Sequence, residues 1–169
     1  MSLYSVDKLI SEARRIAADY RRATGKPLGI SAEIARHDAC TYLGLEADEN
    51  AIGYDAVGIR GKRAGLRFQI KGRAIFDENK GGQRLGQFKL DQNWDHLALV
   101  IMDEDFAATE IYEVSRQELI DDLDESGTTS RHKRGAMSVA RFKHLAHLVW
   151  SRDEGLIEDE LWDNQASNS

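Results

Sequence analysis

Six consecutive apolar residues, Leu97 to Met102, constrain the fold of this chain more than any other feature. A strand that is apolar along both sides of its backbone has to be covered on both faces, as the central strands of layered α/β proteins are. The sequence therefore predicts a sheet with other segments packed on both of its faces, and a central strand at His96–Met102.

The rest of the chain supplies further elements for such a layered structure. Helical spacing and capping residues predict helices at Val6–Ala23, at Ser31–Gly44 with Ser31 as N-cap, and after the capping residues Ser115 and Ser138, the last helix using Val149. Residues rich in β-formers predict strands at Tyr54–Arg60, Leu66–Arg73 and Thr109–Val114, whereas Leu45–Asn50 is expected to be a polar turn. We therefore predict an α/β fold with a mixed sheet of about four to five strands flanked by helices.

The length of 169 residues fits a single domain. We expect residues 1–150 to form it, with an N-terminal helical segment over residues 1–24, and residues 151–169 to form an acidic, partly disordered tail. Cys40 is the single cysteine, and neither a signal-peptide pattern nor an apolar run of membrane-spanning length stands out. These features predict a cytoplasmic protein that does not associate with membranes.

Charge is distributed unevenly along the chain. The formal net charge is −6, yet the segment from Ile59 to Ile75 contains six basic residues and no acidic one. A second basic run extends from Arg131 to Lys143. Basic patches on an acidic protein fit the binding of phosphate at one place, although a solvated surface explains such runs equally well.

Three polar residues around the second expected strand carry most of the functional information. Successive side chains of a strand point to opposite faces, so Gln69 and Lys71 share one face while Phe68 and Ile70 point into a core. Asp55 stands on the preceding expected strand. A carboxylate, a neutral oxygen ligand and an amine at one point are what a metal-dependent phosphodiesterase needs.

The order and spacing of Gly53-Tyr54-Asp55 and Gln69-Ile70-Lys71 resemble the PD-(D/E)xK nuclease superfamily, most nearly its Mrr-like and Holliday-junction-resolvase-like branches. The resemblance covers about Ser31 to Val114. It implies a restriction-endonuclease-like fold and an endonuclease that hydrolyses DNA phosphodiester bonds with Mg²⁺ or Mn²⁺ as cofactor.

The resemblance also implies roles for individual residues. Asp55, the side-chain oxygen of Gln69 and the carbonyl of Ile70 would bind the metal, and Glu33 from the preceding helix would complete the site. Lys71 would orient or help to deprotonate the attacking water. Glutamine at position 69 departs from the usual acid of the family, so the second carboxylate of Glu33 would restore affinity for the cation.

DNA is the expected partner, and a homodimer is left open. The basic residues that would contact the DNA backbone are Arg60, Lys62, Arg73, Lys80 and Arg84. No nucleotide cofactor is expected, because the glycines between Gly81 and Gly86 lack the strand–turn–helix context of a dinucleotide-binding motif.

Four alternatives stay open. In the first, Asp55 and Lys71 form a structural salt bridge on a solvated strand face. In the second, Glu33 only complements the N-terminus of its helix. Gln69 would mark a catalytically decayed nuclease-fold module that binds nucleic acid or a protein partner. In the last alternative, the chain is an accessory subunit whose acidic C-terminal part docks a partner.

Overall fold

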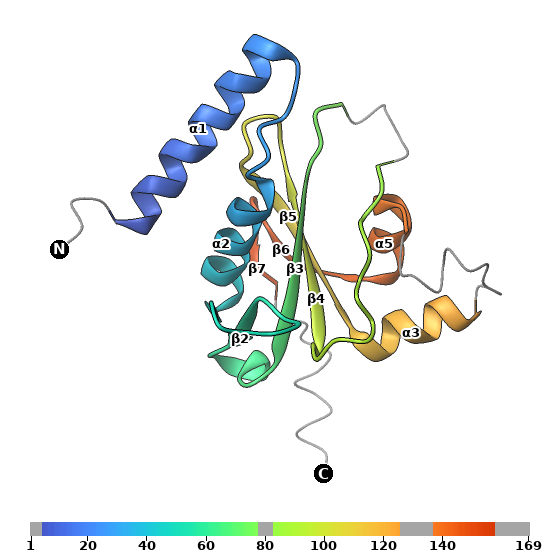
Figure 1. The fold of residues 1–169 in the computed structure, drawn as a ribbon. Coiled ribbons are helices and arrows are strands. Elements are labelled where there is room, and N and C mark those ends of the chain that lie inside the picture. Colours follow the sequence, from blue (N-terminus) through green and yellow to red (C-terminus); the bar gives the residue numbers. More distant parts are fainter. Residues whose placement is uncertain (1–4, 78–82, 126–136, 158–169) are drawn as a thin grey trace.

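The computed structural model describes residues 5–77, 83–125 and 137–157 (Figure 1). The helices are α1 (Val6–Thr24), α2 (Ser31–Leu43), the 3₁₀ turn η1 (Gly61–Arg63), α3 (Arg116–Glu125) and α5 (Val139–Leu145). The strands are β1 (Leu45–Ala47), β2 (Ala56–Gly58), β3 (Arg67–Ala74), β4 (His96–Met102), β5 (Ala108–Ser115), β6 (His147–Ser151) and β7 (Gly155–Leu156). Among these described helices, none is both long and apolar enough to cross a membrane.

All seven strands form one mixed sheet in which spatial order follows chain order from β1 to β7. Strands β3 and β4 are parallel, and the other neighbouring pairs are antiparallel. A parallel pair needs a crossover connection, which here is the segment between β3 and β4. The predicted α/β class and mixed sheet are confirmed, whereas the predicted number of strands was too low.

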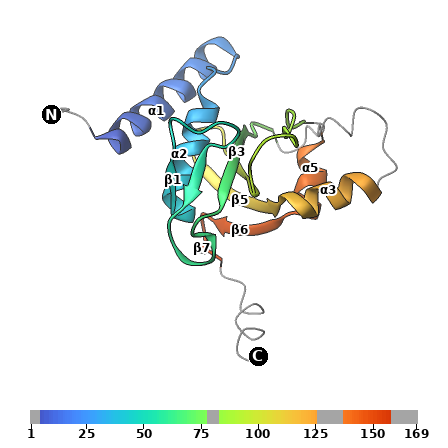
Figure 2. The same ribbon diagram turned by 60° about the horizontal axis from the view of Figure 1, so that its bottom comes forward.

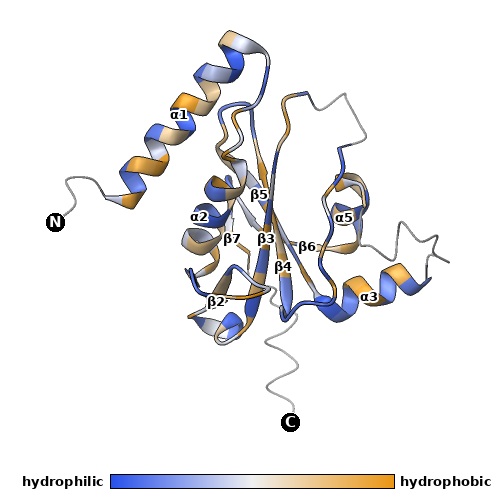
Figure 3. Ribbon diagram, viewed as in Figure 1, coloured by the Kyte–Doolittle hydropathy of each residue, from blue (hydrophilic) through white to orange (hydrophobic). Residues whose placement is uncertain are grey.

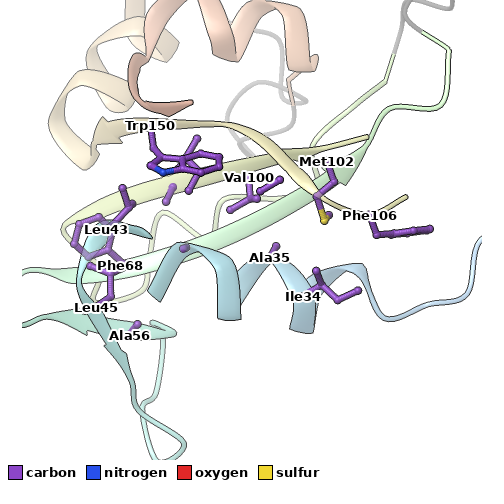
Figure 4. Close-up of a cluster of buried hydrophobic side chains, with 14 of the residues drawn as sticks. Ile34, Ala35, Leu43, Leu45, Ala56, Phe68, Val100, Met102, Phe106 and Trp150 are labelled. Carbon is purple, nitrogen blue, oxygen red and sulfur yellow. The ribbon is translucent and has the colours of Figure 1, made fainter. Parts of the chain in front are cut away.

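Two apolar clusters cover the two faces of the sheet. The first cluster lies between the sheet and α2 and includes Phe68, Ala98 and Val100 (Figure 4). The second cluster lies on the other face, under the crossover segment, α3 and α5, and includes Leu97 and Leu99. Alternate residues of β4 thus enter alternate clusters, as its continuously apolar sequence predicts. Figure 2 shows α2 and α5 on opposite sides of the sheet.

Helix α2 approaches β3 closely at Gly72. A Cβ atom on Gly72 would lie 2.4 Å from the Cβ atom of Ala35 and 3.1 Å from the carbonyl oxygen of Ser31. Any larger residue would therefore push α2 away from the sheet. This contact fixes α2 over the first cluster and leaves the opposite face of β3 to the crossover segment.

The predicted helix boundaries are largely confirmed. Ser5 caps α1, and Gly25 ends it in the left-handed conformation. Ser115 and Glu118 form a reciprocal capping box at α3, with nitrogen–oxygen distances of 3.1 Å and 2.8 Å. The prediction for Ser31 was wrong, because Ile30 occupies the N-cap position of α2 and Ser31 is its first helical residue.

Short edge strands account for most of the differences from the sequence analysis. The expected turn after Gly44 contains β1, and β2 is shorter than predicted. Val149 lies in β6 instead of the last helix. The sheet continues to Leu156, past the boundary expected at residue 150, whereas residues 158–169 of the expected tail lie outside the described residues. Strands of two or three residues show too little alternation to be read from sequence alone.

Candidate functional site

Asp55 is held directly before β2 by three hydrogen bonds. Its N–H donates to the carbonyl oxygen of Phe68 at 2.8 Å, and its own carbonyl oxygen accepts from the N–H of Asp48 at 3.1 Å. Carboxylate oxygen Oδ2 accepts from the N–H of Ile70 at 2.8 Å. No described residue forms a hydrogen bond with Oδ1, so one carboxylate oxygen is available beside β3.

The strand register brings Asp55 and Gln69 to the same level. Ala56 pairs with Phe68 in the antiparallel β2–β3 ladder, and continuing that register by one residue places Asp55 opposite Gln69. Opposed residues share one face of a sheet, and Lys71 lies two residues beyond Gln69 on that face. Gln69 and Lys71 are therefore placed on one face, that of the second cluster, and the Asp55 carboxylate lies beside them at the edge of β3.

Gln69 carries an unsatisfied polar atom. Its side chain is buried, and Oε1 is the only buried side-chain nitrogen or oxygen among the described residues that has no hydrogen-bond partner. Leaving such an atom unpaired costs about 1–3 kcal/mol, so it calls for an explanation such as a bound ion. A side-chain amide oxygen is a suitable ligand for a hard divalent cation.

The carbonyl group of Ile70 faces the same edge as Asp55. In an extended strand, the N–H and C=O groups of one residue point to the same side. The N–H of Ile70 donates to the Asp55 side chain. Ile70 lies beyond Phe68, the last residue of β3 that pairs with β2. The Ile70 carbonyl therefore points toward the Asp55 side of β3 and not toward β4.

Lys71 is partly buried under the crossover segment. Its Nζ atom lies 5.8 Å from the centre of the Phe88 ring and would be 3.8 Å from a Cβ atom on Gly86. Burial, and then the positive charges of Arg73 and Lys89, lower the pKa of Lys71, while Asp55 acts in the opposite direction. Lys71 forms no ion pair within 4 Å with any described acid, so the structural salt bridge with Asp55 is not found.

Asp55 lies at the edge of β3, where it influences groups on both faces. Its charge acts on Lys71 on one face and on Cys40 of α2 on the other. Burial is the main cause that raises the pKa of the Cys40 thiol to about 11, so this thiol is protonated at neutral pH. Cys40 is therefore a poor nucleophile at neutral pH.

Glu33 is not brought together with the trio. It is exposed in the first turn of α2, the helix that covers the opposite face of β3 from Gln69 and Lys71. Within the described part of the chain, no group of three or more His, Cys, Asp or Glu side chains is arranged to hold a metal. The carboxylate that the structure places beside Ile70 is that of Asp55.

The basic residues expected to contact DNA separate into two groups. Arg60 and Lys62 are exposed near the turn between β2 and β3, at the far end of the hairpin from Asp55. Arg73 lies nearer to Lys71, and its Nε donates to the carbonyl oxygen of Arg84 at 3.0 Å. Lys80 lies outside the described residues.

Lys89 is a neighbour of Lys71 that the sequence analysis missed. Its carbonyl oxygen accepts hydrogen bonds from the indole nitrogen of Trp94 and the N–H of Gln92, both at 3.0 Å. These bonds help to hold the crossover segment over β3. No sequence signal identifies Lys89 as a neighbour of Lys71. That proximity depends on the path of the crossover segment between β3 and β4.

A buried ion-pair network was also missed. The guanidinium of Arg63 donates to both carboxylate oxygens of Glu113 at 2.7–3.2 Å, and His96 Nδ1 lies 3.0 Å from Glu113 Oε1. Gly58 allows η1 to fold this closely, since a Cβ atom there would lie 1.8 Å from the Arg63 carbonyl oxygen. Arg63 is therefore unavailable to DNA, and Arg67 is likewise paired, with Asp95 at 3.1 Å.

Comparison with known proteins adds no family assignment: no protein-family model matches the chain, and a search of curated proteins finds no relative.

Proposed function

We propose that this protein is a metal-dependent endonuclease that hydrolyses DNA phosphodiester bonds, with a restriction-endonuclease-like fold. The observation that carries the proposal is the unpartnered, buried oxygen of Gln69 on the same sheet face as Lys71 and level with Asp55. The α/β class, with a mixed sheet between helical layers, is compatible with the proposed fold.

The oxygen groups at this point fit a hard divalent cation. Oδ1 of Asp55, Oε1 of Gln69 and the carbonyl oxygen of Ile70 would hold Mg²⁺ or Mn²⁺, which prefer oxygen ligands. Such a cation would supply electrostatic stabilisation of the developing charge on a phosphate and would lower the pKa of a bound water. Glu33 is not needed in this assignment, and water would complete the coordination shell.

Lys71 is suited to positioning water or phosphate. Its ammonium group is partly buried and has no described acidic partner, so its hydrogen-bonding capacity is available to substrate. Because the pKa of Lys71 is lowered, a larger fraction of its amine is neutral at a given pH. A neutral amine can accept a proton, which favours a role as a base. Arg73 and Lys89 would add positive potential for the DNA backbone.

The first test is plasmid nicking by purified protein in Mg²⁺ or Mn²⁺. Asp55→Asn preserves an oxygen that can accept from the Ile70 N–H but removes the charge, so we expect activity to fall at least about 100-fold. The exposed residue Glu46 of β1 provides the control, Glu46→Gln, which is expected to cut normally. Nicking that persists in EDTA, or in Asp55→Asn, would rule out the proposal.

The assignment of Gln69 as a ligand predicts a gain of affinity. Gln69→Glu adds a second carboxylate to the site and is expected to tighten Mg²⁺ binding roughly tenfold or more in calorimetric titration. Gln117→Glu on the exposed surface of α3 adds the same charge elsewhere and should leave binding unchanged. Equal affinities for the two variants would remove Gln69 from the ligand set.

A second candidate function has one specific observation in its favour. Among the described residues, no group of three or more His, Cys, Asp or Glu side chains surrounds Asp55, and a site with few carboxylates holds Mg²⁺ weakly. The chain would then be a decayed nuclease-fold module that retains DNA through its basic residues. Salt-sensitive retention of DNA without saturable metal binding would support this function over the first.

A further inference from the structure

Helix α1 stands at one end of the molecule (Figure 1). It packs on the first cluster through the small residues Ala17 and Ala18, and charged side chains beside them add further contacts. Arg14 pairs with the buried Asp38 at 2.9 Å, and the guanidinium of Arg21 lies 3.6 Å from the centre of the Phe76 ring. Arg22 pairs with Asp105 in the turn between β4 and β5. These contacts fix the orientation of α1 relative to the sheet.

With α1 held in this way, its apolar stripe faces solvent. Val6, Leu9, Ile16 and Tyr20 are between 41% and 65% exposed, although they belong to an amphipathic helix (Figure 3). Together with Ala13, they recur at alternating intervals of three and four residues. This is the spacing of a coiled-coil seam, which packs against another helix.

A row of alternating charges runs beside the stripe. From the N-terminus to the C-terminus its members are Lys8, Glu12, Arg15, Asp19 and Arg22, again three or four residues apart. Some of them form exposed ion pairs within the helix, such as Arg15 with Glu12 at 2.6 Å. Exposed pairs of this kind are weak and can exchange partners at little cost.

The charge row is complementary to itself when two helices lie antiparallel. In that arrangement Lys8 of one helix faces Asp19 of the other, and Glu12 faces Arg15, so opposite charges meet along the seam. Leu9 then lies level with the segment between Ile16 and Tyr20 of the other helix, and Ala13 sits near the centre, where its small size permits close approach. The 19 residues of α1 give a seam of roughly 28 Å.

We infer that the apolar stripe of α1 is the interface between two copies of this chain, paired antiparallel through α1. The occupant is a second copy because the charge row matches itself in reverse. This inference does not depend on the proposed nuclease function, since it uses no residue of the candidate site.

The molar mass in solution tests the inference. Light scattering on the purified full chain should give twice the 19.0 kDa mass of one chain at micromolar concentration. Leu9→Glu combined with Ile16→Glu should give a single chain with unchanged helical circular dichroism. Single-chain mass for the wild type at about 100 μM, or a dimer that survives the double substitution, would overturn the inference.

A charge swap distinguishes antiparallel self-pairing from any other dimer. Lys8→Glu alone brings two acids together and should weaken dimerisation about tenfold, as should Asp19→Lys, which brings two lysines together. The combination of both changes restores opposite charges and should recover wild-type affinity. Failure of the combined variant to recover would contradict the antiparallel arrangement, even if a dimer exists.

Discussion

Replacing Glu113 by alanine is expected to lower the free energy of unfolding by about 3–5 kcal/mol. The substitution leaves the buried guanidinium of Arg63 without its counter-ion and removes the hydrogen-bond partner of His96. The network joins the β2–β3 turn to β5, so its loss loosens the hairpin that carries Asp55. Urea unfolding at pH 7 measures the change.

This contribution of Glu113 should disappear in acid. Burial is the largest single influence and raises its pKa, but hydrogen bonds and charge from His96 and Arg63 together outweigh burial and lower it. A group whose pKa is lower in the folded protein stabilises it above the ordinary value of 4.5. The difference between wild type and Glu113→Ala should therefore shrink as pH falls through the lowered value.

Two further variants show whether the effect comes from an unpaired charge. Glu46→Ala on exposed β1 should change stability by less than about 0.5 kcal/mol. Arg63→Met combined with Glu113→Leu removes both charges and should recover much of the stability lost in Glu113→Ala. A loss below about 1 kcal/mol for Glu113→Ala would contradict a buried ion pair.

Lys71→Met is expected to change activity and stability in opposite directions. Loss of the amine should reduce nicking about 10²–10⁴-fold, the usual contribution of a residue in acid–base catalysis. The same change removes a partly buried cation that lacks a described partner, so the free energy of unfolding should rise by about 1 kcal/mol at pH 7. Nicking rates and urea unfolding of one preparation measure both effects.

The stability gain of Lys71→Met should depend on pH. The lowered pKa means that the wild-type folded protein gives up the Lys71 proton more readily than the unfolded chain does. Wild-type stability therefore rises between the lowered pKa and the ordinary lysine value of about 10.4, and the advantage of the variant shrinks over that range.

Lys89→Met is the matched control for Lys71→Met. Lys89 is exposed and lies near Lys71, so its removal deletes a nearby charge but not the amine at the site. We expect a reduction of nicking below about tenfold. Equal losses in the two variants would show that the region contributes only positive potential.

The central part of the fold could be predicted because its sequence pattern is strong. Leu97–Met102 specifies a strand covered on both faces, and β4 enters both clusters. Ser115 and Ser138 mark helix N-termini through local chemistry. The edge strands have no comparable signal, because pairing with a neighbour rather than their own sequence defines them.

The candidate site was only partly predictable. Alternation along β3 correctly separates Gln69 and Lys71 from Phe68 and Ile70, since that depends on local geometry. The position of Lys89 depends on long-range folding of the crossover segment. Pairing of Arg63 with Glu113, 50 residues apart, could not be read from a run of basic residues.

Calorimetric titration of the purified protein with Mn²⁺ and Mg²⁺ tests most directly whether Asp55, Gln69 and Ile70 form a cation site beside Lys71. We expect saturable binding of one ion per chain in the wild type and in Glu46→Gln, and loss of that binding in Asp55→Asn. Absence of saturable binding in the wild type, or undiminished binding in Asp55→Asn, would contradict the account.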